Sequence, residues 1–228
     1  MTTSGTATFT LDLAELIDEA FERCGAEGAR TGYDFKTARR SLNLMLSEWA
    51  SRGINLWVIE QGVIPLVAGT ATYTLPADTV DILEHVVRTG SGSTQSDLVI
   101  PRVAFPEYAV LTNKNVQGRP TQVYVNRQAT APQITLYPVP DTNGPYTFVY
   151  WRMRRIQDAG GATNNMDVPF RFLPCLVAGL AYHLALKVPN ALERLPVLRE
   201  QYDNAWAQAA SEDRDRAPIR FVPRAARV

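Results

Sequence analysis

Residues 34–62, DFKTARRSLNLMLSEWASRGINLWVIEQG, contain a change in the pattern of apolar residues at Gly53. Before Gly53 the apolar residues recur every three or four positions, as on one face of a helix. They are Phe35, Ala38, Leu42, Met45, Leu46 and Trp49. After Gly53, short runs rich in Val, Ile, Tyr and Trp are separated by Pro, Gly and Thr, which is typical of strands. The stretch therefore predicts a helix from about Asp34 to Arg52, followed by a β region.

A second helix is predicted before this stretch. Apolar residues share one helix face between Leu13 and Cys24. Asp12, with Glu15 three residues later, forms an N-terminal cap, and Gly25 tolerates the positive φ that often ends a helix. A short loop that contains glycine joins the two helices, so we expect a helical hairpin.

Helical spacing returns near the C-terminus. After Asp167 the sequence predicts a helix with one broad apolar face, with Pro169 in its first turn. Another helix is predicted from about Leu192 to Asp213, with Pro196 in its first turn. The chain therefore has a pair of predicted helices at each end.

Seven strands are predicted between the two helix pairs. They are expected near residues 56–66, 71–75, 82–88, 98–103, 122–127, 133–137 and 146–156. Residues 141–144 predict a hairpin turn, residues 91–97 a flexible loop, and residues 105–111 a short helix.

These elements predict an α+β protein. Because each amphipathic helix needs an apolar partner, we expect the two terminal helix pairs to form one four-helix bundle. An antiparallel β domain, a barrel or a sandwich, would be inserted between them. The expected domains are a helical bundle (residues 1–53 and 167–213), an inserted β-rich domain (54–166) and an extended basic C-terminal arm (214–228).

Composition and charge exclude several classes of protein. The 23 basic and 23 acidic side chains give zero net charge, which argues against a protein that coats nucleic acid without specificity. We find no secretory signal at the N-terminus, and the longest apolar stretch, residues 172–186, is broken by Pro174 and too short to span a membrane. We expect an intracellular protein without membrane contact, in which Cys24 and Cys175 are reduced core thiols.

Known motifs for nucleophiles, metals and phosphate binding are missing from the sequence, so we expect no cofactor and no metal. His85 follows Glu84 in a predicted strand, which directs the two side chains to opposite faces. His183 is expected in a core or an interface. The nearby carboxylates Asp78, Asp81 and Glu84 offer a possible acid and base pair, although Asp78 lies where short polar residues commonly form turns.

Two segments carry clusters of charge. The first predicted helix presents Asp18, Glu19 and Glu22 on its outer surface, which in most proteins is a solvated face. The last segment has five arginines against one aspartate, a local charge of +4. Its basic residues are Arg214, Arg216, Arg220, Arg224 and Arg227, and its apolar ones include Ile219, Phe221 and Val222. This combination suits an extended segment that becomes ordered on a partner, while a frayed chain end is the simpler interpretation.

The stretch 34–62 resembles the head-to-tail adaptor family of tailed bacteriophages, whose members are also called connectors, head completion proteins or tail accessory factors. The resemblance is carried by the patterns LN-x-ML and W-x-x-x-G-x-x-LW. In this sequence they are Leu42, Asn43, Met45, Leu46, Trp49, Gly53, Leu56 and Trp57. The runs LPADTVDILEHVVR (75–88) and PFRFLPCLVAGLAYHLALK (169–187) extend the resemblance over most of the chain. None of these residues is a reactive group, and the resemblance implies a protein that is not an enzyme.

The resemblance implies a structural virion protein that forms a ring of identical subunits, a dodecamer, beneath the portal protein. The ring would bind the tail tube or nozzle protein, connect the capsid to the tail, and let DNA pass through its channel during ejection without specific binding. The protein would be assembled in the host cytoplasm and located in the virion neck.

Within this ring, charge suggests two sites. We expect Asp18, Glu19 and Glu22 to line the DNA channel, where they would repel phosphate groups. The arm would bind the portal through Arg214, Arg216, Arg220, Phe221, Val222, Arg224 and Arg227. Two alternatives remain open: a tail or neck binding module that does not contact the portal, and a virion-associated hydrolase that uses Asp78, Asp81 and Glu84.

Overall fold

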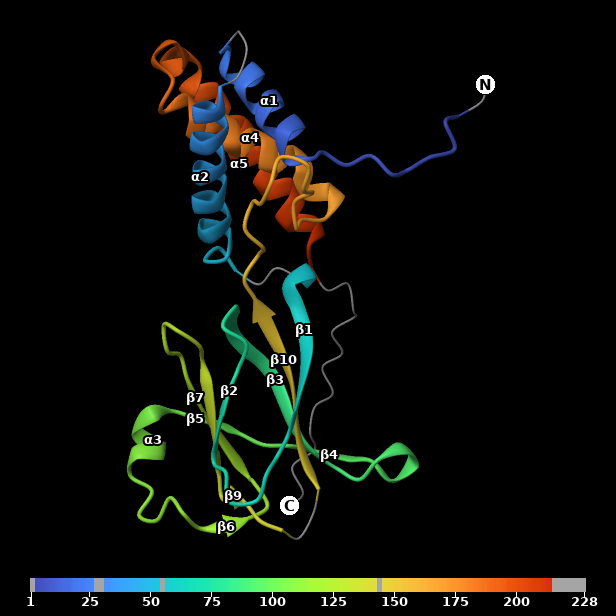
Figure 1. Cartoon of the computed structure of the whole chain (residues 1–228), viewed down its shortest axis with the longest axis vertical. Coiled ribbons are helices and arrows are strands. Elements are labelled where there is room, and N and C mark those ends of the chain that lie inside the picture. Colours follow the sequence, from blue (N-terminus) through green and yellow to red (C-terminus); the bar gives the residue numbers. More distant parts are fainter. Residues whose placement is uncertain (1–2, 27–30, 54–55, 143–144, 215–228) are drawn as a thin grey trace, which may run out of the picture. The chain divides into compact units, whose positions relative to one another are not determined.

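The chain divides into two compact units in its structure, a computed structural model that describes residues 3–26, 31–53, 56–142 and 145–214 (Figure 1). The helical unit comprises Met1–Trp49 with Gln157–Val228, and the β unit comprises Ala50–Ile156. The protein is therefore of mixed α+β class, as predicted. Apart from Arg214, the C-terminal arm lies outside the described residues.

Four long helices are described in the helical unit. They are α1 (Leu13–Cys24), α2 (Gly32–Trp49), α4 (Leu173–Ala185) and α5 (Leu195–Glu212), and two short 3-10 helices, η3 (Phe170–Phe172) and η4 (Pro189–Arg194), precede α4 and α5. Helix α4 is buried along most of its length and packs against α1, α2 and α5. It is the centre of this unit because its apolar residues surround the helix instead of forming a single stripe.

The ends of α1 are those predicted from the sequence. The Asp12 carboxylate accepts a hydrogen bond from the Glu15 backbone N–H (2.9 Å), and the Glu15 carboxylate accepts one from the Asp12 N–H (3.2 Å). Gly25 ends the helix with φ of 73°. The two hydrogen bonds between Asp12 and Glu15 satisfy N–H groups at the start of α1 that have no partner inside the helix.

Of the two prolines predicted in the first turns of the C-terminal helices, one lies where it was predicted and the other does not. Pro196 lies in the first turn of α5, as predicted. The first-turn proline of α4, however, is Pro174, and Pro169 lies one turn earlier, at the start of η3. The 3-10 turn between them was not expected.

The β unit contains ten described strands and three short helical turns. The strands are β1 (Ile59–Pro65), β2 (Thr72–Thr74), β3 (Thr79–Thr89), β4 (Ser96–Val99), β5 (Arg102–Val103), β6 (Gln117–Gly118), β7 (Gln122–Asn126), β8 (Gln133–Tyr137), β9 (Val139–Pro140) and β10 (Tyr146–Arg154). The turns are η1 (Leu56–Val58), η2 (Gly92–Thr94) and α3 (Phe105–Ala109).

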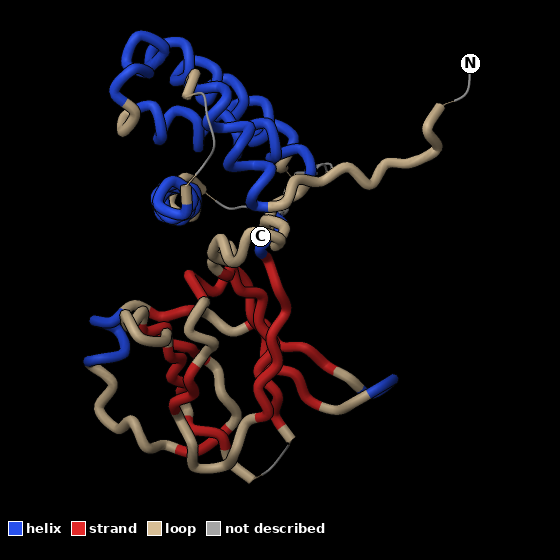
Figure 2. Tube along the Cα trace, turned by 45° about the horizontal axis from the view of Figure 1, so that its top comes forward, coloured by secondary structure: helices blue, strands red, loops and turns tan. Residues whose placement is uncertain are grey.

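Two four-stranded sheets form most of this unit, and Figure 2 shows them facing each other. The first has the order β1-β10-β3-β4 and is antiparallel throughout; the second has the order β2-β8-β7-β5, in which β5 and β7 are parallel. Strands β6 and β9 form a separate parallel pair. Within the described residues neither sheet closes into a barrel, so the barrel alternative is wrong, and the β unit is not purely antiparallel.

Three local predictions also need correction. The strand expected at 98–103 is two strands, because Pro101 lacks the N–H that a ladder needs and the chain passes there from the first sheet to the second. Residues 91–97, predicted as a flexible loop, contain η2 and the start of β4 in a projecting hairpin (Figure 1). The expected strand at 56–66 begins as η1. The turn predicted at 141–144 lies partly outside the described residues.

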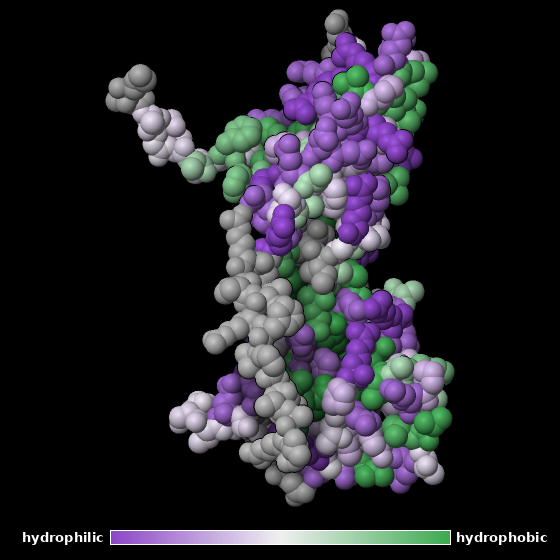
Figure 3. All heavy atoms as spheres, turned by 180° about the vertical axis from the view of Figure 1, so that it is seen from behind, coloured by the Kyte–Doolittle hydropathy of each residue, from purple (hydrophilic) through white to green (hydrophobic). Residues whose placement is uncertain are grey.

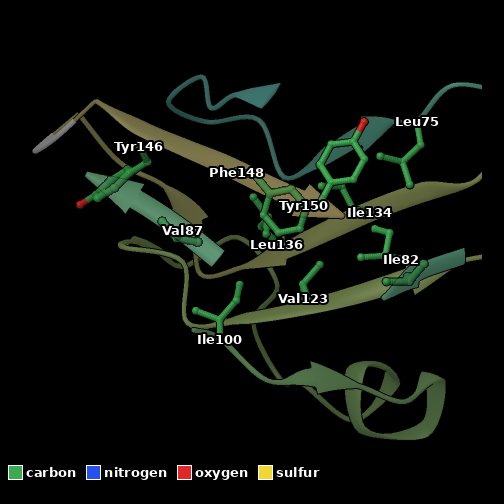
Figure 4. Close-up of a cluster of buried hydrophobic side chains, with 11 residues drawn as sticks. Leu75, Ile82, Val87, Ile100, Val123, Ile134, Leu136, Tyr146, Phe148 and Tyr150 are labelled. Carbon is green, nitrogen blue, oxygen red and sulfur yellow. The ribbon is translucent and has the colours of Figure 1, made fainter. Parts of the chain in front are cut away.

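The core of the β unit takes side chains from both sheets (Figure 4). Phe148 and Tyr150 of β10 belong to the same buried cluster as Ile134 of β8 and Val123 of β7. Burial of such side chains contributes about 1.5–3 kcal/mol each. One hydrophobic core therefore stabilises both sheets together.

Candidate assembly surfaces

The part of the adaptor-like motif that lies on α2, Leu42 to Trp49, belongs to the helical unit, whereas Gly53, Leu56 and Trp57 belong to the β unit. Trp49 is fully buried, its ring lies 5.0 Å from that of Trp206 and 5.8 Å from that of Phe172, and its Nε1–H donates to the Tyr202 hydroxyl at 2.7 Å. Asn43 Oδ1 accepts a hydrogen bond from the Ala159 N–H at 2.7 Å. The motif therefore links α2 to η3, α5 and the chain that returns from the β unit.

A glycine allows the helices to approach closely at the same place. A Cβ atom on Gly179 would lie 2.5 Å from Met45 Sδ and 2.7 Å from Tyr202 Cε2. These distances are too short for any side chain, so α4 contacts α2 and α5 through its backbone here. The role of the motif is to position helices, which is a structural role.

The acidic residues of α1 lie along the wall of a groove in the helical unit. Asp18 and Glu22 are exposed, Glu19 is half-buried and pairs with Arg23 at 2.8 Å, and all three line the groove together with Glu15. The structure thus brings Asp18, Glu19 and Glu22 to one surface, as the helical spacing predicts.

The groove has an apolar floor and a volume of about 900 Å³. Its apolar lining comes from two segments distant in the sequence: Phe9 and Leu11 before α1, and, in the adjoining η3 and α4, Phe170, Leu173, Pro174 and Val177. Figure 3 shows apolar side chains gathered where the N-terminal segment meets the helices. Phe9 and Phe170 are 76% and 78% exposed, which is unusual for phenylalanine.

Sequence reasoning identified the acidic wall but missed the floor. Phe9 lies in a polar segment before the first predicted helix, and its isolation there was the available signal. Phe170 follows Pro169 in the first turn of the helix predicted after Asp167, so the sequence offered no signal for it.

The C-terminal arm is described only at its first residue. Arg214 donates through Nε to the Ser211 carbonyl oxygen. Just before it, Asp213 pairs with Arg171 of η3, and the Asp213 side chain is only 4% exposed. The remaining arm residues, which are Arg216, Arg220, Phe221, Val222, Arg224 and Arg227, lie outside the described residues.

Asp78, one of the three carboxylates that the hydrolase alternative requires, lies in a cluster with arginines and Glu60. Asp78 accepts hydrogen bonds from Arg152 Nη1 (2.5 Å) and Nη2 (3.2 Å), and Glu60 accepts from Arg152 Nη2 (3.0 Å) and Arg154 Nε (2.6 Å). The hydrogen bond from Arg152 holds the pKa of Asp78 below its ordinary value. A general acid needs a raised pKa, so this environment does not suit acid catalysis.

Asp81 has a comparable structural role. It pairs with Arg102 Nη1 at 3.0 Å and with Arg127. Arg102 lies on β5 and Arg127 directly follows β7, so Asp81 connects β3 of the first sheet to the second sheet. Glu84 is exposed on β3. The three carboxylates therefore form no acid and base pair of the kind that the hydrolase alternative requires.

The two histidines and two cysteines occupy packed positions. His85 stacks on Phe148 with ring centroids 5.7 Å apart, and burial lowers its pKa because the charged form loses hydration. His183 Nε2 lies 4.0 Å from Glu48 Oε2, and its ring packs against Tyr202. Cys24 and Cys175 are buried thiols that form no disulfide, as predicted.

The described part of the chain contains neither a metal-binding cluster nor a helix suited to crossing a membrane. No group of three or more His, Cys, Asp or Glu side chains there could hold a metal ion. Among the described helices, none combines the length and the apolar character that crossing a membrane requires.

Comparison with known proteins gives one family. A family model described as SU10 adaptor protein matches residues 11–225. A search of curated proteins gives no match. One similar solved chain belongs to the neck of an empty GTA particle; it is 9% identical, the match covers 80% of this chain and 83% of that chain, and the TM-score is 0.25. A structural likeness this weak carries no argument about fold or function.

Proposed function

Since this chain belongs to the SU10 adaptor protein family, we propose that its specific role is to form a closed ring between the portal protein and the tail. The broader role follows from the family: the chain is a structural adaptor of the virion neck and is not an enzyme. The sequence resemblance to head-to-tail adaptors is thereby confirmed. The observation that carries the proposal is the family match over residues 11–225, nearly the whole chain.

The helical unit would supply the body of each subunit in the ring. In this proposal α1, α2, α4 and α5 act as one four-helix bundle, supported by the packing of α4 against the other three. A ring closes through two different complementary patches on each subunit, repeated around the axis. A dodecamer is the expected stoichiometry, and assembly would take place in the host cytoplasm.

The acidic face of α1 would line the DNA channel. Asp18 and Glu22 are exposed and Glu19 is half-buried, so their charges can act on a passing polyanion. Like charges repel over roughly one Debye length, about 8–10 Å at physiological salt. DNA would then slide through the channel without binding to its wall.

The basic arm would bind the portal protein on the capsid side, and the tail tube or nozzle protein would bind the opposite side of the ring. Five arginines and the apolar pair Phe221 and Val222 give the arm both charge and anchors for such a contact. A neck module that binds only the tail is the competing possibility, and the test below distinguishes the two.

The test measures binding of the full-length protein to purified portal protein and, separately, to purified tail protein. An arm variant replaces Arg216, Arg220 and Arg224 by Gln, and a control variant replaces three exposed arginines of the described chain, Arg40, Arg119 and Arg199, in the same way. We expect the arm variant to lose portal binding at least about tenfold while tail binding is unchanged. Equal portal binding by both variants would contradict the role of the arm, and absence of portal binding by the unaltered protein would favour the tail-only module.

Ring geometry is tested by electron cryomicroscopy of purified necks. A ring of this chain with α1 facing the axis is the expected result. A map that places Asp18, Glu19 and Glu22 at the outer rim would refute the channel lining while leaving the adaptor role intact.

A further inference from the structure

The groove of the helical unit combines two recognition chemistries. Its wall carries four carboxylates, Glu15, Asp18, Glu19 and Glu22, against one basic residue, Arg23. Its floor is apolar and includes the exposed rings of Phe9 and Phe170. A ligand that complements both features must be cationic and apolar along its length.

The C-terminal arm of the same chain has this composition. Residues 215–228 contain four arginines and one aspartate, a net charge of +3, and the apolar residues Ile219, Phe221 and Val222 lie between the arginines. Pro218 and Pro223 disfavour a helix, and an extended segment directs neighbouring side chains to opposite sides. Such a segment can direct Ile219 and Phe221 toward a floor while Arg220 faces away from it.

The described chain ends beside the groove. The buried carboxylate of Asp213 pairs with Arg171, and the neighbouring Phe170 is part of the groove lining. From that point an extended arm of residues 215–228 reaches up to roughly 45 Å, whereas Glu15 and Glu22 are separated by only about 10 Å along α1. The arm is therefore long enough to follow the whole acidic wall.

We propose that in the free subunit residues 215–228 bind in this groove of their own chain. The arm then covers the two exposed phenylalanines and neutralises most of the acidic charge of α1. The arm can occupy only one site at a time, so binding of the arm to any other protein would uncover the groove. This inference concerns the isolated subunit and does not depend on the portal or channel contacts proposed above.

The proposal is tested with cysteine pairs in the full-length protein. One variant combines Asp18→Cys on the groove wall with Phe221→Cys in the arm. The matched control combines Leu44→Cys, which is 66% exposed on α2 and does not line the groove, with the same Phe221→Cys. The natural Cys24 and Cys175 are 1% and 0% exposed, so they do not compete in mild oxidation.

We expect the groove pair to give an intramolecular disulfide, identified by peptide mass, with a yield at least about five times that of the control, because binding raises the local concentration of the arm thiol. At 1 M salt, where the Debye length is about 3 Å, the yield of the groove pair should fall toward that of the control. Adding Glu22→Lys should lower the yield, whereas the matched Glu200→Lys on α5 should not.

Two results would overturn the proposal. Equal yields for the groove pair and the Leu44 pair would show that the arm does not select the groove. The second test mixes chains carrying only Asp18→Cys with chains carrying only Phe221→Cys at the same total concentration. Disulfide-linked dimers in a yield equal to that of the double variant would assign the groove to the arm of another copy.

Discussion

The hydrogen bond between Trp49 and Tyr202 offers the sharpest test of how the helical unit is held together. Trp49 is fully buried and Tyr202 is 2% exposed, so water cannot replace a lost partner without a rearrangement. Tyr202→Phe keeps the ring and its packing but removes the oxygen that accepts from the Trp49 indole N–H at 2.7 Å. The change therefore removes the acceptor of the buried Trp49 N–H while it leaves the aromatic packing in place.

The expected cost of Tyr202→Phe is about 1–2 kcal/mol, since a buried donor without a partner loses its hydration without compensation. For a unit of this size that corresponds to a decrease in Tm of roughly 4–8 °C. Trp49→Phe removes the donor as well, and in the background of Trp49→Phe the additional cost of Tyr202→Phe should fall below about 0.5 kcal/mol.

The assay is urea unfolding followed by circular dichroism at 222 nm, which reports on the helical unit, with Tyr33→Phe as control. Tyr33 is 73% exposed and its change should be neutral within about 0.5 kcal/mol. If Tyr202→Phe is equally neutral, or if the two single changes are additive in the double variant, then the contact between α2 and α5 does not depend on this hydrogen bond.

Two further changes test the helix contact and the arginine cluster. Gly179→Val should destabilise the helical unit by about 1–3 kcal/mol, because the valine side chain would collide with Met45 and Tyr202. The control Gly32→Ala should not lower Tm, because a Cβ atom at position 32 meets no atom within 4 Å. Equal melting temperatures for the two variants would refute the close approach of α4 to α2 and α5. The pKa of Asp78 is lowered in the folded protein, so its pairing with Arg152 stabilises the fold above the unfolded value near 3.8 and this contribution is lost as the pH falls through the folded pKa. The wild type should exceed Asp78→Asn in stability by no more than about 1 kcal/mol at pH 7, since the side chain is 47% exposed. The difference should shrink in urea titrations as the pH is lowered below 3.8, and a difference independent of pH would argue against this ion pair.

Sequence reasoning succeeded where local chemistry decides the structure. The cap of α1 and its end at Gly25 depend only on neighbouring residues. Strand β7 alternates between buried and half-buried residues over its five positions, so its pattern is also readable locally. Sequence reasoning failed where distant segments decide. The division at Pro101 depends on a second sheet that is available to accept β5, and the two-residue strands β6 and β9 exist only because they pair with each other.

The predictions for β10 and for α1 show that a local pattern locates charged residues but does not reveal the distant residues that surround them. The sequence predicted a strand at 146–156, but it did not reveal that Arg152 shares the face of this strand that carries Phe148 and Tyr150 in the core. Arg152 is 8% exposed and is tolerated there because carboxylates reach it from β1 and from the turn before β3. Likewise, charge pattern located the acidic wall of α1, whereas the groove requires Phe170, about 150 residues later in the chain.

The contacts of Asp81 have a mechanical consequence. Dispersion and burial between two apolar faces resist separation, but they are non-directional and oppose sliding only weakly. Asp81 of the first sheet forms ion pairs with Arg102 and Arg127 of the second sheet, and these directional contacts favour one lateral alignment of the two sheets. The Asp81 ion pairs therefore oppose sliding of one sheet over the other, a motion that the apolar core alone would resist less.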